Sequence, residues 1–196
     1  MALLVCRRFR RKENMRFHML TGLIVLLAVA ILGETTMPKK VHQGGFSVVG
    51  IEVRTTNAKE ASGDGVIGKQ WQKFFQDGIQ RKIRVRVDDT VYAVYSDYAS
   101  DHNGEYSFLI GVKVNPSATA SAGMVLRKIP AGEYAVITSD KGPVGKVVTA
   151  AWQQIYLLED KHQLGGPRAY KADFEVHDQR AADRQSSQVD LYVGVK

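Results

Sequence analysis

Residues 129–156 of the chain read IPAGEYAVITSDKGPVGKVVTAAWQQIY and combine one predicted strand with one predicted helix. Residues 134–139 are rich in β-branched side chains and follow a Pro-Ala-Gly turn, which predicts a strand. The second half of the stretch has apolar side chains at helical spacing, which predicts an amphipathic helix. The apolar side of that helix consists of Val144, Val147, Val148, Ala151, Trp152 and Ile155.

The elements predicted before and after this stretch show that one order, strand–helix–strand–strand, occurs twice in the chain. Upstream, residues 46–55 predict a strand, residues 67–79 a helix that ends near Gly78, and residues 91–98 and 106–114 a hairpin. Downstream, residues 169–176 and 189–195 predict two further strands, and residues 124–129 predict a short additional strand. The two strand–helix–strand–strand units are offset by roughly 80–90 residues. We therefore expect an α+β fold of antiparallel sheets, in which two halves with pseudo-twofold symmetry enclose a central ligand cleft.

The composition fits a single domain. A chain of 196 residues that is 44% hydrophobic can build one core. The single cysteine, Cys6, excludes an internal disulfide and a cysteine-based zinc site, and the five histidines are scattered, so we expect no metal and no cofactor. Residues 63–68 match a dinucleotide-binding glycine pattern, but a polar loop rather than a strand precedes them, which argues against a nucleotide site.

The positive charge is concentrated at the N-terminus. The formal net charge is +7, and residues 1–40 contain eight Lys or Arg and two acidic residues. The rest of the chain has 19 basic and 18 acidic residues, so the domain itself is close to neutral. A nucleic-acid-binding domain carries its own basic face. We therefore expect no nucleic-acid binding by this chain alone.

The N-terminal segment, residues 1–36, precedes every repeated element. A basic stretch over 7–16 is followed by an apolar run over 19–33, which is the order of a secretory signal or a membrane anchor. The run is shorter than the ~20 residues of a spanning helix, and Met37 is an alternative start. Two interpretations stay open. Either residues 19–33 contact a membrane and the domain is anchored or exported, or the segment is an upstream extension of a cytoplasmic domain.

Three blocks of the chain resemble the GyrI-like domain, the effector-binding domain of AraC- and MerR-type regulators. They are residues 129–156, YAVYSDYASDHNGEYSFLIGVKV (92–114) and DFEVHDQRAADRQSSQVDLYVGVK (173–196), and the match covers about residues 41–196. The resemblance implies two strand–helix–strand–strand halves around a ligand cleft that binds amphipathic, often cationic, aromatic compounds. Because the first 40 residues have no helix-turn-helix pattern, we interpret the chain as a stand-alone form of this domain.

Glu175 is the predicted ligand carboxylate. In the GyrI-like family a glutamate on the matching strand faces the cleft and pairs with the cationic ligand, and Glu175 is the matching residue here. Alternation places Glu175 on the face opposite Phe174, and the same reasoning on the last strand places Tyr192 on the face of Glu175. Without the resemblance, the same pattern also fits a solvated strand glutamate. We expect a cleft carboxylate to be unpaired in the free protein, so that its loss leaves stability unchanged or higher.

Aromatic residues complete the predicted site. Trp152 is expected in the core or in the cleft wall, and Tyr92 and Tyr98 are expected to share one hairpin face that lines the cleft, with Tyr95 on the other face. Ordinary sheet packing is the alternative for these tyrosines. The helical spacing of Trp71, Phe74 and Phe75 favours core packing for all of them.

The sequence is compatible with three functions. The first is a binding module that senses or sequesters a lipophilic, cationic, aromatic small molecule. The second is a hydrolase of reactive small molecules, in which Glu175 is the base and a cleft tyrosine the acid, as in some GyrI-like proteins. The third is a protein-binding inhibitor, for example of a topoisomerase, as the family name suggests. We favour binding over catalysis and leave a homodimer open.

Overall fold

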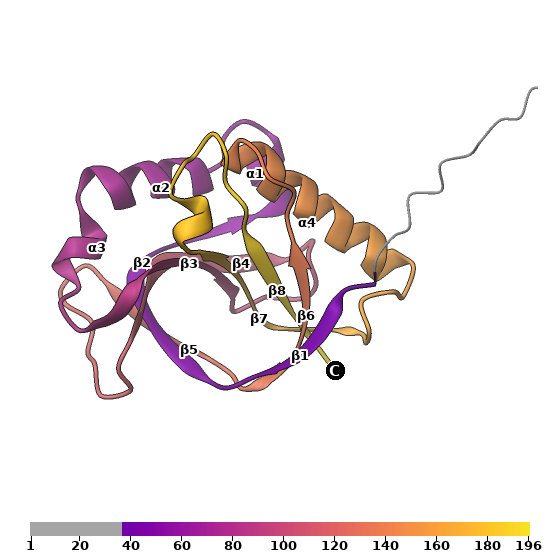
Figure 1. Cartoon of the computed structure of the whole chain (residues 1–196), viewed down its shortest axis with the longest axis horizontal. Coiled ribbons are helices and arrows are strands. Elements are labelled where there is room, and N and C mark those ends of the chain that lie inside the picture. Colours follow the sequence, from indigo (N-terminus) through magenta and orange to yellow (C-terminus); the bar gives the residue numbers. More distant parts are fainter. Residues whose placement is uncertain (1–36) are drawn as a thin grey trace, which may run out of the picture. The chain divides into compact units, whose positions relative to one another are not determined.

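The computed structural model describes residues 37–196, so the predictions for the segment 1–36 lie outside the described residues. The described chain alternates strands and helices in one domain (Figure 1). The strands are β1 (Lys39–Gln43), β2 (Phe46–Thr56), β3 (Arg86–Ser96), β4 (Glu105–Val114), β5 (Val125–Ile129), β6 (Gly132–Thr138), β7 (Arg168–His177) and β8 (Asp190–Val195). The helices are α1 (Asn57–Ala61), α2 (Ile67–Gln76), α3 (Ile79–Lys82), α4 (Val144–Asp160) and the 3-10 helix η1 (Gln179–Ala181).

All eight strands belong to one antiparallel sheet with the order β1-β6-β8-β7-β3-β4-β2-β5. The predicted α+β fold with antiparallel pairing is therefore confirmed, with a single sheet. The first half contributes β2, β3 and β4, the second half contributes β6, β7 and β8, and the halves join where β3 pairs with β7. Strand order alone does not establish a rotation, so the pseudo-twofold symmetry stays a prediction.

The helix boundaries follow from local chemistry. The predicted helix over 67–79 ends at Gln76, and Gly78 takes the left-handed conformation with φ of 60°, which glycine adopts without strain. The short helix α3 follows it. The loop predicted before α2 contains α1, whose first turn is capped by the Thr56 side chain accepting from the backbone N–H of Lys59. Among residues 37–196, no helix combines the length and apolar character that crossing a membrane requires.

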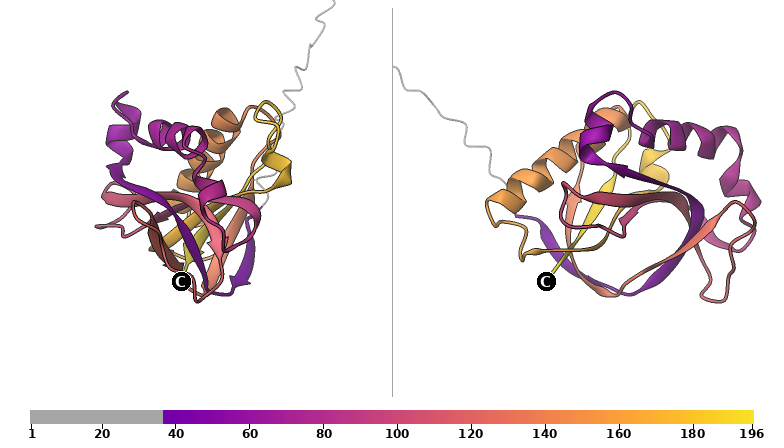
Figure 2. Two further views of the ribbon diagram at one scale, coloured as in Figure 1. Left: turned by 90° about the vertical axis from the view of Figure 1, so that its left-hand side faces the viewer. Right: turned by 180° about the vertical axis from the view of Figure 1, so that it is seen from behind.

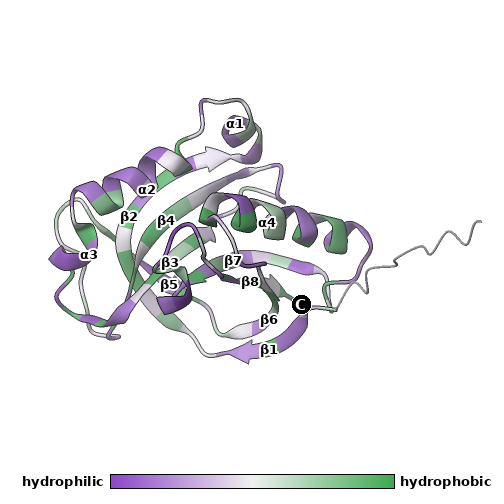
Figure 3. Cartoon of the chain, turned by 45° about the horizontal axis from the view of Figure 1, so that its top comes forward, coloured by the Kyte–Doolittle hydropathy of each residue, from purple (hydrophilic) through white to green (hydrophobic). Residues whose placement is uncertain are grey.

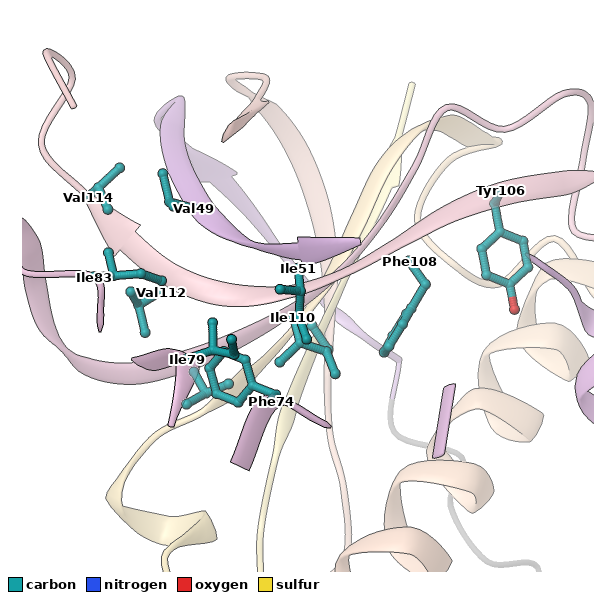
Figure 4. Close-up of a cluster of buried hydrophobic side chains, with 12 residues drawn as sticks. Val49, Ile51, Phe74, Ile79, Ile83, Tyr106, Phe108, Ile110, Val112 and Val114 are labelled. Atoms are coloured by element: carbon teal, nitrogen blue, oxygen red, sulfur yellow. The ribbon is translucent and has the colours of Figure 1, made fainter. Parts of the chain in front are cut away.

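Helices α2 and α4 lie on the same side of the sheet (Figures 1 and 2). Hydrophobic and hydrophilic bands alternate along both helices (Figure 3), as expected for helices with one buried face. Beneath α2 and α3, Phe74 and Ile79 pack against strand residues such as Phe108 and Ile110 (Figure 4). Beneath α4, a second cluster contains Ile155 and residues of β6 and β8.

The other face of the sheet is buried as well. A third cluster there contains Val48, Val94, Leu109, Ile129, Tyr134, Ala172 and Phe174. The sheet bends around this cluster, and β2 is strongly curved in Figure 1. Gly50 and Gly111 lie opposite each other on β2 and β4, and a Cβ atom on Gly50 would come within 1.9 Å of the Ile110 carbonyl oxygen. This close approach of two backbones requires glycine at both positions.

Candidate functional site

An open groove of about 1830 Å³ lies over the middle of the sheet, between α2 and α4. Strands β3 and β7 form its floor, so it lies over the junction of the two halves. The segment 178–184, which includes η1, borders a third side. The side chains that line the groove include Asn57, Trp71, Phe75, Asp88, Asp89, Tyr95, Tyr106, Trp152, Tyr156, Glu175, His177, Asp178, Arg180 and Arg184.

Aromatic rings cover the groove from both helices. On α2 the Trp71 ring is stacked on Phe75 with centroids 5.7 Å apart, and Phe75 is 47% exposed. On α4 the Trp152 ring lies edge-on to Tyr95 of β3 at 4.8 Å. Tyr95 in turn contacts Tyr106 of β4 at 5.7 Å. These rings present flat, polarisable surfaces toward the groove, which suit an aromatic or cationic ligand.

Glu175 lies on the floor of the groove and is 2% exposed. Its Oε1 atom accepts hydrogen bonds from the Tyr95 hydroxyl at 2.6 Å and from Trp152 Nε1 at 2.8 Å. Its Oε2 atom accepts from His177 Nε2 at 2.7 Å. The carboxylate is therefore held by three donors, and the expectation of an unpaired carboxylate in the free protein was wrong.

The hydrogen bonds decide the charge of Glu175. Burial by itself raises the pKa of a carboxyl group, because a poorly hydrated surrounding disfavours the charged form. At Glu175 the hydrogen bond and charge of His177, with the hydrogen bonds from Trp152 and Tyr95, outweigh burial, and the pKa lies below its ordinary value. Burial and the neighbouring Glu175 raise the pKa of Tyr95 well above its ordinary value, so the hydroxyl remains a donor. Glu175 is thus an ionised carboxylate at neutral pH.

One end of the groove is polar. The Asn57 side chain accepts from the Tyr106 hydroxyl at 3.0 Å and donates to the Tyr156 hydroxyl at 3.0 Å. Glu60, close by, accepts from the backbone N–H groups of Val66 and Ile67 and so fixes the start of α2. The two hydrogen bonds of Asn57 hold the rings of Tyr106 and Tyr156 in place, which favours a preformed groove wall.

A buried ion pair lies beside Glu175, on the same face of β7. Arg168 Nη2 donates to Asp173 Oδ2, and both side chains are almost fully buried. The same Oδ2 atom accepts from the Tyr98 hydroxyl at 2.7 Å, and Oδ1 accepts from the backbone N–H of Gly194 at 2.8 Å. This cluster fixes β7 against β8 where their register shifts. It supports the strand that carries Glu175.

Of the predicted site residues, Glu175 and Trp152 line the groove, and Tyr92 and Tyr192 do not. Tyr192 lies directly opposite Phe174 in the β7–β8 register and stacks on it at 4.6 Å. Directly opposite residues of an antiparallel pair project from the same face, so the prediction that Tyr192 shares the face of Glu175 was wrong. Tyr92 packs against Phe46 and Phe174 on the face of the sheet that lies away from the groove.

Tyr98 does not line the groove either, but it lies next to the groove residue Tyr106. The prediction that Tyr92 and Tyr98 share a face was wrong, because Asp97 has a positive φ of 51° and interrupts the alternation after Ser96. The Tyr98 ring therefore contacts Tyr106 at 5.7 Å and Tyr170 at 5.4 Å. Its hydroxyl donates a hydrogen bond to Asp173 Oδ2.

The sequence prediction missed four residues of the groove, Tyr95, His177, Trp71 and Phe75. Tyr95 and His177 both hydrogen-bond to Glu175. The prediction placed Tyr95 on the face away from the cleft, which was wrong, and it placed His177 on the face of Glu175 without identifying their contact. Trp71 and Phe75 were predicted in the core with Phe74, but only Phe74 is buried. Helical spacing could not separate these residues, because the groove and the core lie along adjacent sides of α2.

Comparison with known proteins gives a family match. The family model described as Cass2, integron-associated effector binding protein, matches residues 41–195. YobU of Bacillus subtilis, described as a candidate transcriptional regulator, is 30% identical over 148 residues, which are 75% of this chain and 90% of YobU. The transcriptional regulator BrlR of Pseudomonas aeruginosa is 33% identical over 159 residues, which are 79% of this chain and 54% of BrlR.

Solved structures share the fold. An integron cassette protein from the mobile metagenome of Vibrio cholerae superposes with a TM-score of 0.65 and 26% identity, covering 82% of this chain and 97% of that protein. A second structure, of the protein SAV2435 bound to tetraphenylphosphonium, has a TM-score of 0.65 and 19% identity, covering 81% of this chain and 93% of SAV2435.

Proposed function

Since the chain belongs to the Cass2 family of integron-associated effector binding proteins, we propose that its groove binds lipophilic, cationic, aromatic small molecules, with Glu175 as the anionic anchor. The membership agrees with the resemblance of the sequence to GyrI-like effector-binding domains. The observation that carries the proposal is a buried carboxylate, held in its charged form on the floor of a groove whose walls are aromatic.

The energetics favour a lipophilic cation over other ligands. A cation near an aromatic face gains ~0.5–2 kcal/mol per ring, and the groove presents Trp71, Trp152 and Tyr95. A charge in a poorly hydrated site also attracts its partner more strongly than it would in water. A hydrophilic cation would gain the same attraction but lose more hydration on entering the groove. An anion would be repelled by Glu175.

The dimensions of the groove favour ligands of varied shape. Pockets for drug-sized ligands are commonly about 300–1,000 Å³, and this groove is larger, at about 1830 Å³. We further propose that the groove follows a pseudo-twofold axis at the β3–β7 junction, with each half contributing one helix wall. The tetraphenylphosphonium ligand of SAV2435 supports this class of ligand, since that protein shares the fold.

A hydrolase is the second candidate, and one contact favours it. Tyr95 and Glu175 are 2.6 Å apart on the groove floor, the arrangement that an acid and a base in one site would have. The lowered pKa of Glu175 argues for binding instead, because a carboxylate stabilised by three donors is a weaker base.

Tryptophan fluorescence tests the proposal directly. Trp71 and Trp152 are the two tryptophans of the chain, and both line the groove. Titration with tetraphenylphosphonium should change their emission in a saturable way, and the uncharged triphenylphosphine oxide should bind more weakly. Absence of a saturable change with the cation up to about 1 mM, where binding would be worth only ~4 kcal/mol, would overturn the proposal.

A further inference from the structure

His177 lies where a ligand cation would be recognised. Its Nε2 atom is 2.7 Å from Glu175 Oε2, and its side chain is 10% exposed. Its ring also lies edge-on to Trp71 of α2 at 4.9 Å. An imidazole between a carboxylate and an aromatic ring makes the contacts that a bound cation would make.

The two oxygens of Glu175 are used differently. Oε1 accepts from Tyr95 and Trp152, whose donors carry no positive charge. Oε2 accepts from His177 alone. Because a carboxylate only accepts, Nε2 carries a proton, and the second ring nitrogen decides whether the imidazole is charged. Nδ1 of His177 has no hydrogen-bond partner among the described residues.

We propose that His177 is a specificity-determining residue of the groove: its protonated ring is an internal counter-ion of Glu175, so that binding of a permanently charged cation releases a proton from His177. This inference rests on the proposed function and adds a coupling between ligand and proton. A protonated ring neutralises Glu175 and repels a second cation. A neutral ring still donates through Nε2 and leaves the charge of Glu175 available to the ligand.

Other charged groups border His177 from each neighbouring element, and they are exposed or already paired. On the β3 side these are Asp88, which accepts from the backbone N–H of Thr90, and Asp89, which pairs with Arg86. After β7, Asp178 pairs with Arg180, which also pairs with Asp190. From the same segment, Arg184 lies over the ring of Phe75 at 5.4 Å. Glu175 is therefore the buried carboxylate that His177 contacts directly.

The coupling has a definite sign. A histidine changes charge in the range of about pH 5 to 8. Protonation of His177 opposes the binding of a permanent cation at Glu175, so affinity for the cation falls with falling pH, by at most about tenfold per pH unit. An uncharged ligand of similar shape does not exchange charge with His177, so its affinity should change little. The groove should thus prefer permanent cations more strongly as the pH rises.

Calorimetric titration of the full-length protein with tetraphenylphosphonium bromide tests the inference. Measurements near pH 6 in two buffers of different ionisation heat give the number of protons released. We expect a fractional proton release by the wild type and weaker binding at pH 5.5 than at pH 8. His177→Gln and His177→Asn, which can donate to Glu175 but do not titrate, should bind the cation without proton release and without this pH dependence.

His42 provides the matched control. It pairs with Glu133 at 2.9 Å on the exposed β1–β6 edge, outside the groove, so His42→Gln should release as many protons as the wild type. Binding by the wild type without proton release, or an undiminished release by both His177 variants, would overturn the inference while leaving the proposed function intact. Absence of binding by the wild type at every pH would overturn both.

Discussion

The hydroxyl of Tyr95 on β3 donates a 2.6 Å hydrogen bond to Oε1 of Glu175 on β7. The two residues are 80 positions apart in the sequence and come from the two halves of the domain, which meet where these strands pair. The anionic centre of the groove is therefore assembled across the junction, and neither half forms it alone. Trp152 adds a donor from α4 to the same oxygen.

Removal of the Tyr95 hydroxyl tests whether this group only supports the Glu175 carboxylate or also contacts the ligand. In Tyr95→Phe, Glu175 keeps its charge and two of its donors, so the free energy of unfolding should fall by about 1 kcal/mol. Cation affinity should stay within about threefold of wild type, a difference below ~1 kcal/mol. Denaturant unfolding and fluorescence titration measure these effects. A loss of cation affinity beyond tenfold would mean that the hydroxyl itself contacts the ligand.

The hydrogen bonds of Glu175 make a prediction about stability and pH. Its pKa is lowered in the folded protein, so the stabilisation is present above the unfolded-state value of 4.5 and is lost as the pH falls below it. Glu175→Gln should lower the free energy of unfolding by about 1–3 kcal/mol at pH 7. The gap between variant and wild type should persist down to about pH 4.5 and narrow below it. Urea unfolding at pH 7, 5 and 3.5 checks this, and equal stability at pH 7 would contradict it.

The buried Arg168–Asp173 pair beside Glu175 should matter more for stability than any groove residue. Asp173→Asn leaves the charge of Arg168 without its buried partner, and breaking such a pair costs about 3–5 kcal/mol. Asp64 is an exposed loop residue, and Asp64→Asn should change stability by less than about 0.5 kcal/mol. Thermal unfolding of both variants measures the difference. A small effect of Asp173→Asn would mean that Glu159, which also contacts Arg168 at 3.2 Å, compensates for the lost charge.

Residues 37–196 should fold without the preceding segment. The three buried clusters described above draw on strands and helices between β1 and β8, and every strand of the sheet has a partner within this range. A protein starting at Met37 should therefore unfold cooperatively. Aggregation of this protein, relieved only when the first 36 residues are restored, would contradict the prediction.

The sequence predicted the element order and the position of Glu175, because both depend on local patterns and on the family resemblance. Alternation relates residues within one strand, whereas the faces of two strands are related by their register. The register pairs Phe174 with Tyr192, which places Tyr192 away from Glu175. Both faces of the sheet are buried, so an apolar pattern on β8 could not indicate which face borders the groove.

The contacts of Glu175 lay beyond what the sequence could predict for a similar reason. The Tyr95 hydrogen bond requires the β3–β7 pairing, which no local pattern encodes. The place of Tyr98 depends on a single backbone angle at Asp97. Alternation placed His177 on the same face as Glu175, two residues along the strand. The hydrogen bond between the two side chains depends on side-chain geometry, which the sequence does not give.

Paired titrations of wild type and Glu175→Gln with tetraphenylphosphonium and the uncharged triphenylphosphine oxide test whether Glu175 anchors a cation. Loss of a charged partner worth ~1.5–3 kcal/mol should lower affinity for the cation by roughly ten- to a hundredfold, with affinity for the neutral compound nearly unchanged. Glu52→Gln, at a carboxylate that pairs with Arg127 away from the groove, should alter neither. Equal losses for the cationic and the neutral compound, or unchanged binding of the cation by Glu175→Gln, would contradict the claim.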